Sequence, residues 1–279
     1  LLQYEAFAKN PPDIVHFYQR GPTGFPAPRH LQAAERPGRP RSIMYFSWKP
    51  DLELTWREIA DGAADGTIAS VALELVQYPN LMFFTIHHEP ENDVVTTPGS
   101  GMTPKDYVDM YRHVVEQLRA LGVDNIVLVM VYMGFDRWAD MVDDLYPGDD
   151  VVDWIGYDPY GFEAQTSFDL LLNRPNPQLE WPGFYDWATA KAPGKPIMVA
   201  EWGYDMSAIT DAESVLRDAP AILESRFPAI KALVYWNQEG DRVNARLDQQ
   251  TPEARRFAEA FAEFADDPLF DQTQTAAAP

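Results

Sequence analysis

Seven short apolar stretches recur along the chain, each rich in β-branched or aromatic residues and each followed by a loop or a helical pattern. They lie a few tens of residues apart, which leaves room for a crossover helix between parallel strands. The alternation therefore predicts repeated βα units. The seven predicted strands are Asp13–Gln19, Ser42–Trp48, Leu81–His88, Asn125–Tyr132, Val151–Tyr157, Pro196–Glu201 and Ala232–Asn237.

Seven such units are one short of the eight that close a (β/α)8 TIM barrel. The alternative is an open, doubly wound sheet, but no glycine-rich G-x-G-x-x-G turn follows any of the predicted strands. Tyr4, Phe7 and Ala8 read as the end of a helix that runs directly into the first predicted strand. We therefore expect an α/β barrel whose first strand lies upstream of residue 1.

Two helices have clear starts in the sequence. Thr103 as an N-cap and Pro104 at the first helical position precede apolar residues at helical spacing. Thr251 and Pro252 open a second helix in the same way. No internal repeat or Gly/Ser linker divides the chain, so we expect a single catalytic-type domain over 1–270 and a C-terminal tail over 271–279.

Composition excludes several classes of function. The chain has 43 acidic and 22 basic residues and a net charge of −21, which repels phosphate backbones and anionic lipid surfaces. The longest apolar run, Ile126–Phe135, is about half of the ~20 residues that cross a bilayer. The chain contains no cysteine, so disulfides, thiolate nucleophiles and Cys-ligated metals are excluded. We expect neither a nucleic-acid partner nor a membrane span.

The residues at the ends of the predicted strands are unusual for packing alone. A parallel barrel forms its active site at the C-terminal strand ends. Carboxylates, imidazoles and aromatic rings on one rim suit a sugar, because carboxylates bind hydroxyl groups and rings stack on the C–H faces of pyranosides. We therefore predict a carbohydrate site, with the substrate-binding candidates Trp48, His88, Tyr132, Asp158, Tyr160, Trp202 and Trp236.

Two glutamates stand out among these strand ends. Glu89 and Glu201 each lie where an apolar strand runs out, and counting from an absent first strand puts them at the ends of strands 4 and 7, across the barrel mouth. Hydrolysis of a glycoside needs two carboxyl groups that flank the scissile bond. We therefore predict that Glu89 and Glu201 are the catalytic pair. A carboxyl separation of roughly 5–5.5 Å would imply retention through a glycosyl-enzyme intermediate.

Taken in order, four motifs resemble glycoside hydrolase family 26, of the clan of retaining (β/α)8 glycosidases. They are His88-Glu89, the stretch 146–160 (YPGDDVVDWIGYDPY), the stretch 195–203 (KPIMVAEWG) and Tyr235-Trp236-Asn237. The resemblance implies that Glu89 is the general acid/base and Glu201 the nucleophile.

The same resemblance implies roles for neighbouring residues. His88 would contact the sugar in the −1 subsite, Tyr160 with Asp158 beside it would keep the nucleophile ionised, and Trp236 would form the platform under that sugar. A structural histidine at 88 and a turn-capping role for Asp158 are the simpler alternatives. The resemblance also implies a secreted, β-1,4-mannanase-like enzyme that acts on a polysaccharide, and we expect a monomer.

The sequence departs from the family pattern in two places. Thr85 stands where family members often carry an arginine, and Pro90 to Asp93 replace a Met-Asn-Gly segment. Mixed-linkage glucan and xylan therefore remain possible substrates, and a non-catalytic carbohydrate-binding barrel remains a possible function.

A metal-dependent hydrolase is a third possibility because of His87-His88-Glu89, but no H-E-x-x-H spacing is present. We expect neither a metal nor a cofactor.

Overall fold

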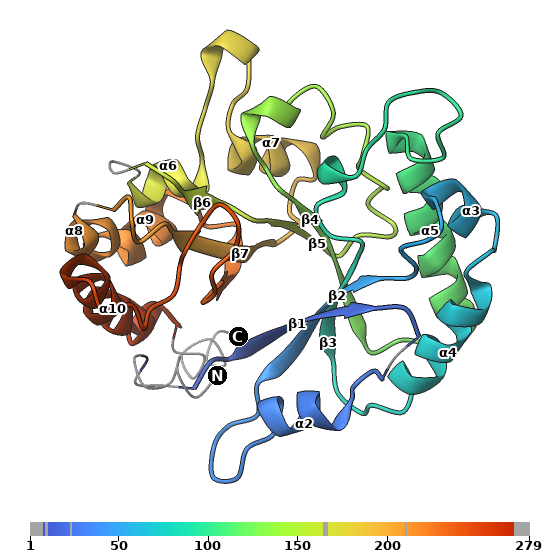
Figure 1. The fold of residues 1–279 in the computed structure, drawn as a ribbon, viewed down its shortest axis with the longest axis horizontal. Coiled ribbons are helices and arrows are strands. Elements are labelled where there is room, and N and C mark those ends of the chain that lie inside the picture. The colour runs from blue at the N-terminus through green and yellow to red at the C-terminus, as the bar shows by residue number, and fades with distance from the viewer. Residues whose placement is uncertain (1–7, 9–10, 23, 164–166, 210, 271–279) are drawn as a thin grey trace.

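The computed structural model describes residues 8, 11–22, 24–163, 167–209 and 211–270. These form a curled parallel sheet in the order β1-β2-β3-β4-β5-β7, with β8 beside β7 and the short β6 paired to the end of β7 (Figure 1). The strands are β1 (Ile14–Arg20), β2 (Ile43–Lys49), β3 (Met82–Ile86), β4 (Ile126–Tyr132), β5 (Trp154–Tyr157), β6 (Tyr160–Gly161), β7 (Ile197–Tyr204) and β8 (Ile230–Tyr235).

The barrel prediction is confirmed, and each of the seven predicted strands is present. The strand ends differ by a few residues, and the two-residue β6 was not predicted. Across the described part of the chain no hydrogen-bonded ladder joins β1 to β8. The predicted helical end at 1–10 lies outside the described residues except for Ala8, and so does the tail at 271–279.

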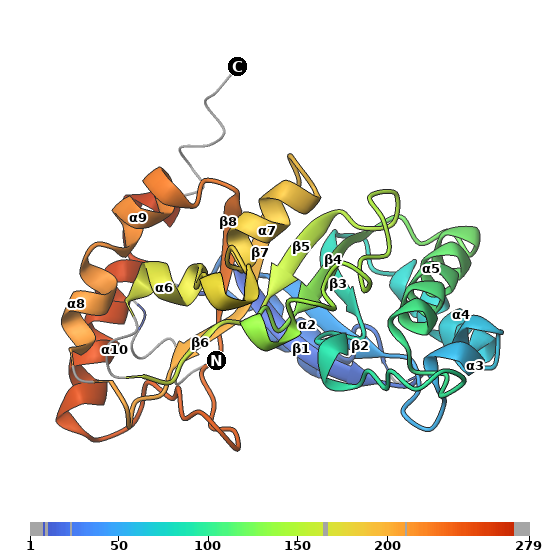
Figure 2. The same ribbon diagram turned by 90° about the horizontal axis from the view of Figure 1, so that it is seen from above.

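Helices cover the outer face of the sheet, as the two views in Figures 1 and 2 show. Both predicted helices are present, and their caps are formed as expected. The Thr103 hydroxyl accepts a hydrogen bond from Asp106 N, and the Thr251 hydroxyl accepts one from Ala254 N. The helices are α2 (Pro28–Ala34), α3 (Trp56–Ala60), α4 (Asp65–Leu75), α5 (Pro104–Ala120), α6 (Phe168–Leu172), α7 (Phe184–Lys191), α8 (Ala212–Arg217), α9 (Ala219–Arg226) and α10 (Pro252–Ala265).

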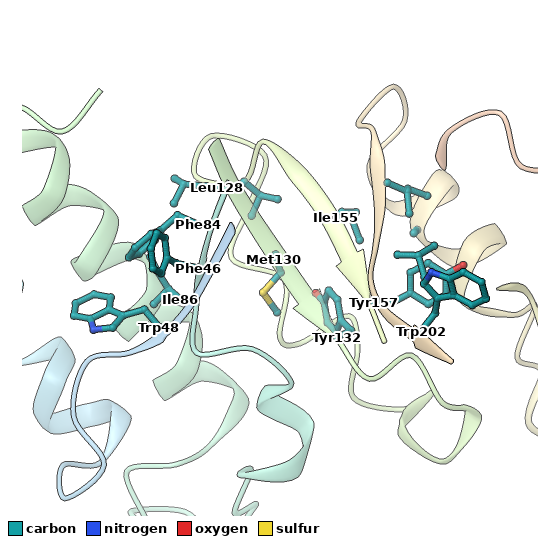
Figure 3. Packing of buried hydrophobic residues seen from close by; sticks show 14 of the residues in the cluster. Phe46, Trp48, Phe84, Ile86, Leu128, Met130, Tyr132, Ile155, Tyr157 and Trp202 are labelled. Atoms are coloured by element: carbon teal, nitrogen blue, oxygen red, sulfur yellow. The ribbon is translucent and has the colours of Figure 1, made fainter. Parts of the chain in front are cut away.

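Side-chain alternation along the strands separates two apolar layers. In β2, Met44, Phe46 and Trp48 belong to the large cluster between sheet and helices, whereas Tyr45 belongs to a small cluster inside the curl of the sheet. Figure 3 shows the outer layer, in which Phe46 and Trp48 lie with Phe84 and Ile86 of β3. None of the described helices is long and apolar enough to span a bilayer.

An irregularity in β7 interrupts this alternation next to the site. Val199 pairs with Leu233 and Trp202 pairs with Tyr235, so three steps along β7 match two steps along β8. One extra residue in a strand reverses the side-chain phase beyond it. Ala200 accordingly belongs to the inner cluster while Trp202 belongs to the outer one, and Glu201 between them reaches the rim.

Candidate active site

Glu201 lies at the end of β7 with each carboxylate oxygen bound to a different phenol. Tyr18 donates a hydrogen bond to Oε1 at 2.5 Å, and Tyr160 donates one to Oε2 at 2.7 Å. Glu201 is only 8% exposed, and burial raises its pKa, whereas the two phenol hydrogen bonds lower it. Two donors on one carboxylate favour its ionised form over that of a neighbour with fewer donors.

Glu89 follows β3 in a conformation that is rare outside glycine. Its φ of +52° places it in the left-handed region, and its backbone N–H donates to Val131 O at 3.0 Å. A non-glycine residue in this region costs on the order of 1 kcal/mol, and such residues cluster at functional sites. The turn continues as a short 3-10 helix over Pro90–Asn92, from which Asn92 Nδ2 donates to Glu89 Oε2 at 3.0 Å.

The two glutamates interact electrostatically. Burial, followed by the charge of Glu201, raises the pKa of Glu89 to about 7. The Lys49 ammonium group opposes this shift. Glu201 holds the negative charge because two phenols donate to it, so Glu89 is the carboxyl group that retains a proton near neutral pH. The pair therefore has the divided protonation that acid/base and nucleophilic roles require.

The remaining residues implied by the family resemblance also lie around this pair. Asp158 follows β5 and is fully buried, and burial together with the charges of Glu201 and Glu89 raises its pKa well above the ordinary value. His88 is neutral because burial lowers its pKa to about 3. The half-buried Trp236 ring packs edge-on against Tyr160, with ring centroids 5.8 Å apart.

Three predicted substrate-binding residues lie elsewhere. Trp48 and Tyr132 are 0% exposed and Trp202 is 1% exposed, and all three belong to the hydrophobic layer between sheet and helices (Figure 3). The prediction for them is wrong. Trp48 and Tyr132 share the outward phase of Phe46 and Met130, and the irregularity in β7 turns Trp202 outward.

Some residues that line the site were not assigned a catalytic or substrate-binding role from the sequence. Lys49, at the end of β2, pairs with Asp93 at 2.8 Å, and His87 Nε2 lies 2.7 Å from the same Asp93 oxygen. Tyr18, at the end of β1, shares its strand face with His16. Side-chain alternation along the strands could have identified Tyr18 and Lys49. Their neighbours in the strand face the outer layer, so these two side chains face the inside of the barrel.

The described residues contain no group of three or more His, Asp or Glu side chains arranged to hold a metal ion. His87 bonds to Trp56 Nε1 and Asp93, and His88 lies on the other side of the turn beside Tyr18. The geometry thus offers paired carboxyl groups and aromatic rings as its chemistry.

Part of the chain matches the model of a known protein family. Residues 67–178, which include Glu89 and Asp158, match the model of glycosyl hydrolase family 26. This central part of the chain is similar to glycosyl hydrolase family 26. The resemblance inferred from the sequence motifs is therefore confirmed.

Individual relatives are distant. Endoglucanase H of Acetivibrio thermocellus is 24% identical over 281 residues, covering 96% of this chain and 29% of that protein. The beta-1,3-xylanase TXYA of a Vibrio species is 25% identical over 147 residues, covering 52% of this chain and 28% of that protein. The chain thus spans less than a third of the length of these curated relatives.

Solved structures show the same fold. The modular endo-β-1,4-mannanase of Cellulomonas fimi, described as a family 26 mannanase, superimposes with a TM-score of 0.63 at 17% identity, covering 96% of this chain and 66% of that one. The family 26 domain of a Prevotella bryantii endo-β-mannanase/endo-β-glucanase gives a TM-score of 0.60 at 15% identity, with 96% and 84% coverage.

Proposed function

We propose that this chain is a retaining glycoside hydrolase that cleaves a neutral β-linked polysaccharide, with Glu201 as nucleophile and Glu89 as general acid/base. The observation that carries the proposal is the contrast between the two carboxyl groups. Glu201 accepts hydrogen bonds from two phenols, whereas Glu89 has a pKa raised to about 7 and bonds to Asn92. Retaining glycosidases need this division between an ionised and a protonated carboxyl group.

The reaction would proceed in two displacements. In the first, a Glu201 oxygen forms a bond to the anomeric carbon while the glycosidic C–O bond breaks, and the Glu89 proton passes to the departing oxygen. In the second, the Glu89 carboxylate takes a proton from water, the water oxygen bonds to the anomeric carbon, and Glu201 is released as a carboxylate. Trp236 would support the sugar bound next to Glu201, and His88, which is neutral, would bind a hydroxyl group.

β-1,4-Mannan is the first substrate candidate, because the Cellulomonas and Prevotella structures are described as mannanases. Mixed-linkage glucan and xylan form the second candidate, since the curated relatives are named an endoglucanase and a xylanase. Thr85 is a reason to keep both substrate candidates. It is fully buried and hydrogen-bonded to Tyr45, so the site lacks the positive charge of the arginine that family members often carry at this position. We also propose internal (endo) cleavage, action outside the cell and a monomeric state.

A polysaccharide panel tests the proposal. The chain is incubated with mannan, galactomannan, glucomannan, mixed-linkage glucan and xylan, and the products are separated by chromatography. We expect oligosaccharides of several lengths from at least one β-glycan and none after Glu201→Ala. Glu89→Ala should lose activity on the polysaccharide yet keep the glycosylation step on an aryl glycoside whose leaving group needs no proton.

Two outcomes would contradict the proposal. Unchanged hydrolysis by Glu201→Ala on every substrate would remove Glu201 as nucleophile. Calorimetric binding of a β-glycan by wild type without any product after long incubation would favour the non-catalytic carbohydrate-binding barrel, and loss of activity with a chelator would favour a metal-dependent hydrolase. Thermal unfolding of both variants should match wild type, which separates lost chemistry from lost folding.

A further inference from the structure

The side chains on the inner face of β1 and β2 form a continuous polar row that ends at Glu201. Ser47 Oγ lies 2.8 Å from His16 Nε2, His16 Nδ1 lies 3.2 Å from the Tyr18 hydroxyl, and that hydroxyl donates to Glu201 at 2.5 Å. The row crosses two neighbouring strands, because Tyr18 and Ser47 are aligned partners in the β1–β2 ladder. Neither Ser47 nor His16 reaches Glu201 directly, so any effect they have passes through Tyr18.

The number of available protons determines which group donates and which accepts in each hydrogen bond of this row. A phenol has one proton, and Tyr18 uses it on Glu201, which as a carboxylate can only accept. The nitrogen that contacts the Tyr18 oxygen must then carry a hydrogen, so His16 Nδ1 is the donor. His16 is neutral, since burial and the nearby His88 lower its pKa well below the ordinary value. Its Nε2 therefore has a free lone pair and accepts the Ser47 hydroxyl proton.

The surroundings fix the imidazole in this orientation. The His16 ring stacks on the Tyr45 ring, with centroids 3.9 Å apart and planes 15° apart. Tyr45 is itself held by a 2.9 Å hydrogen bond to Thr85, whose hydroxyl donates to Val129 O. Stacking therefore prevents the imidazole from turning out of the row, so its two nitrogens keep facing Ser47 and Tyr18.

We propose that Tyr18 is a second positioning residue for the nucleophile, and that Ser47 and His16, in its Nδ1–H tautomer, direct the Tyr18 proton onto Glu201. The inference rests on the proposed function and deepens it. A donor that is already oriented toward the carboxylate stabilises the charge that Glu201 carries before attack and regains when the glycosyl-enzyme ester is hydrolysed. Tyr18 keeps Oε1 in place on the β1 side while Tyr160 keeps Oε2 in place on the β6 side.

The pH dependence follows from the groups that face Glu201. These are Tyr18 on β1, Tyr160 on β6, Glu89 after β3 and Asp158 after β5. Of these, only the two phenols lower the pKa of Glu201 by hydrogen bonding. Removing the Tyr18 hydroxyl should raise the pKa of Glu201. Because Glu201 must be ionised to attack, the acid limb of the pH profile of kcat/KM should move to higher pH.

The first experiment needs no variant. Nitrogen NMR of the 15N-labelled full chain, which has five histidines, reports the tautomer of each imidazole. We expect His16 in the Nδ1–H form in wild type and a change toward the Nε2–H form in Tyr18→Phe, since Nδ1 then loses its acceptor. Finding Nε2–H in the wild-type chain would overturn the proposal.

The second experiment titrates Glu201 by carbon NMR of 13C-labelled glutamate, with Glu201→Gln identifying the resonance. Tyr18→Phe should raise the midpoint of the Glu201 titration by about one pH unit and shift the acid limb of the kcat/KM profile by the same amount. At pH values below this limb, kcat/KM should fall roughly tenfold. Ser47→Ala should shift the Glu201 midpoint and the acid limb in the same direction, by a smaller amount. Tyr146→Phe is the matched control, because it also removes a phenol that donates to a carboxylate, Asp149, at 2.6 Å but away from the site.

These measurements separate the two proposals. If no polysaccharide is cleaved but the His16 tautomer and the Glu201 titration behave as expected, the polar row stands and the proposed hydrolysis fails. If wild type cleaves a β-glycan but Tyr18→Phe leaves the Glu201 titration and the acid limb unchanged, hydrolysis stands and the role of Tyr18 is refuted. Should Tyr18→Phe fail to fold, the wild-type tautomer and the Ser47→Ala titration decide the matter.

Discussion

Lys49 Nζ lies 2.8 Å from Asp93 Oδ2, so the cation that lowers the pKa of Glu89 is held by a carboxylate from the turn that follows Glu89. His87 binds the same Asp93 oxygen, and together the two contacts keep the pKa of Asp93 well below its ordinary value. The proton on Glu89 is therefore under opposing influences: burial and Glu201 favour it, and Lys49 disfavours it.

The first prediction concerns Lys49→Met, which removes this cation while keeping a long side chain. The pKa of Glu89 should rise above about 7. In the proposed mechanism Glu89 donates its proton in the first step, so activity should fall as pH rises through the pKa of Glu89. The alkaline limb of kcat/KM should therefore move to higher pH in the variant. Lys105→Met, which breaks the exposed pair between Lys105 and Asp109, is the control and should leave the limb in place.

The second prediction is the shape of the wild-type profile. Glu89 should set the alkaline limb near pH 7 when kcat/KM is measured on the best polysaccharide. Glu201 should set the acid limb. The apparent pKa values of the two limbs belong to the interacting pair of carboxyl groups rather than to separate residues. A profile that stays flat to pH 9 would contradict a protonated Glu89 as the proton donor.

The third prediction concerns Glu91, which is fully buried next to the site and accepts a hydrogen bond from Met133 N at 2.9 Å. Burial raises its pKa to about 8, whereas in the unfolded chain it is about 4.3. The folded chain binds this proton more tightly, so its stability falls as pH rises from about 4.3 to 8.

Glu91→Gln keeps the accepting oxygen and does not titrate. Its free energy of unfolding relative to wild type should therefore increase with pH, to a gain on the order of a few kcal/mol at pH 8. Denaturant unfolding at pH 5 and pH 8 measures this difference. A gain of equal size at both pH values would show that the ionisation of Glu91 is not its cause.

The fourth prediction compares two tryptophans. Trp202 is 1% exposed and packs against Phe261 and Phe264 of α10, so Trp202→Ala should cost roughly 3–5 kcal/mol of stability. Trp236→Ala should instead lower kcat/KM at least about tenfold with little change in the melting temperature, because its ring is half-buried beside Tyr160. Thermal unfolding and kinetics on one substrate distinguish the two effects.

The sequence predicted the strands well because parallel strands buried on both faces are continuous apolar runs. It also pointed to Glu89 and Glu201, whose catalytic roles stay predictions, since a carboxylate that ends such a run has no packing role. It failed for Trp48, Tyr132 and Trp202, which were assigned by position at a strand end without regard to the face they occupy. Strand phase excludes Trp48 and Tyr132, but the extra residue in β7 that turns Trp202 away is visible only in the pairing with β8.

The contacts around the pair were less accessible to sequence reasoning. Tyr18 and Tyr160 are 142 positions apart, and no local pattern shows that both reach Glu201. The Lys49 and Asp93 pair likewise depends on the path of a turn that begins with two left-handed residues, His87 and Glu89. Such long-range contacts depend on how the curled sheet brings strand ends together.

The extra residue in β7 determines which face of the sheet the proposed nucleophile, Glu201, occupies. If β7 kept regular alternation past Ala200, the Glu201 carboxylate would point into the apolar layer under α10 and the Trp202 indole would point toward the inside of the barrel. The proposed active site therefore depends on a local break in the β7–β8 pairing as well as on its side chains, and a change that made this pairing regular would abolish activity with every contributing side chain still present.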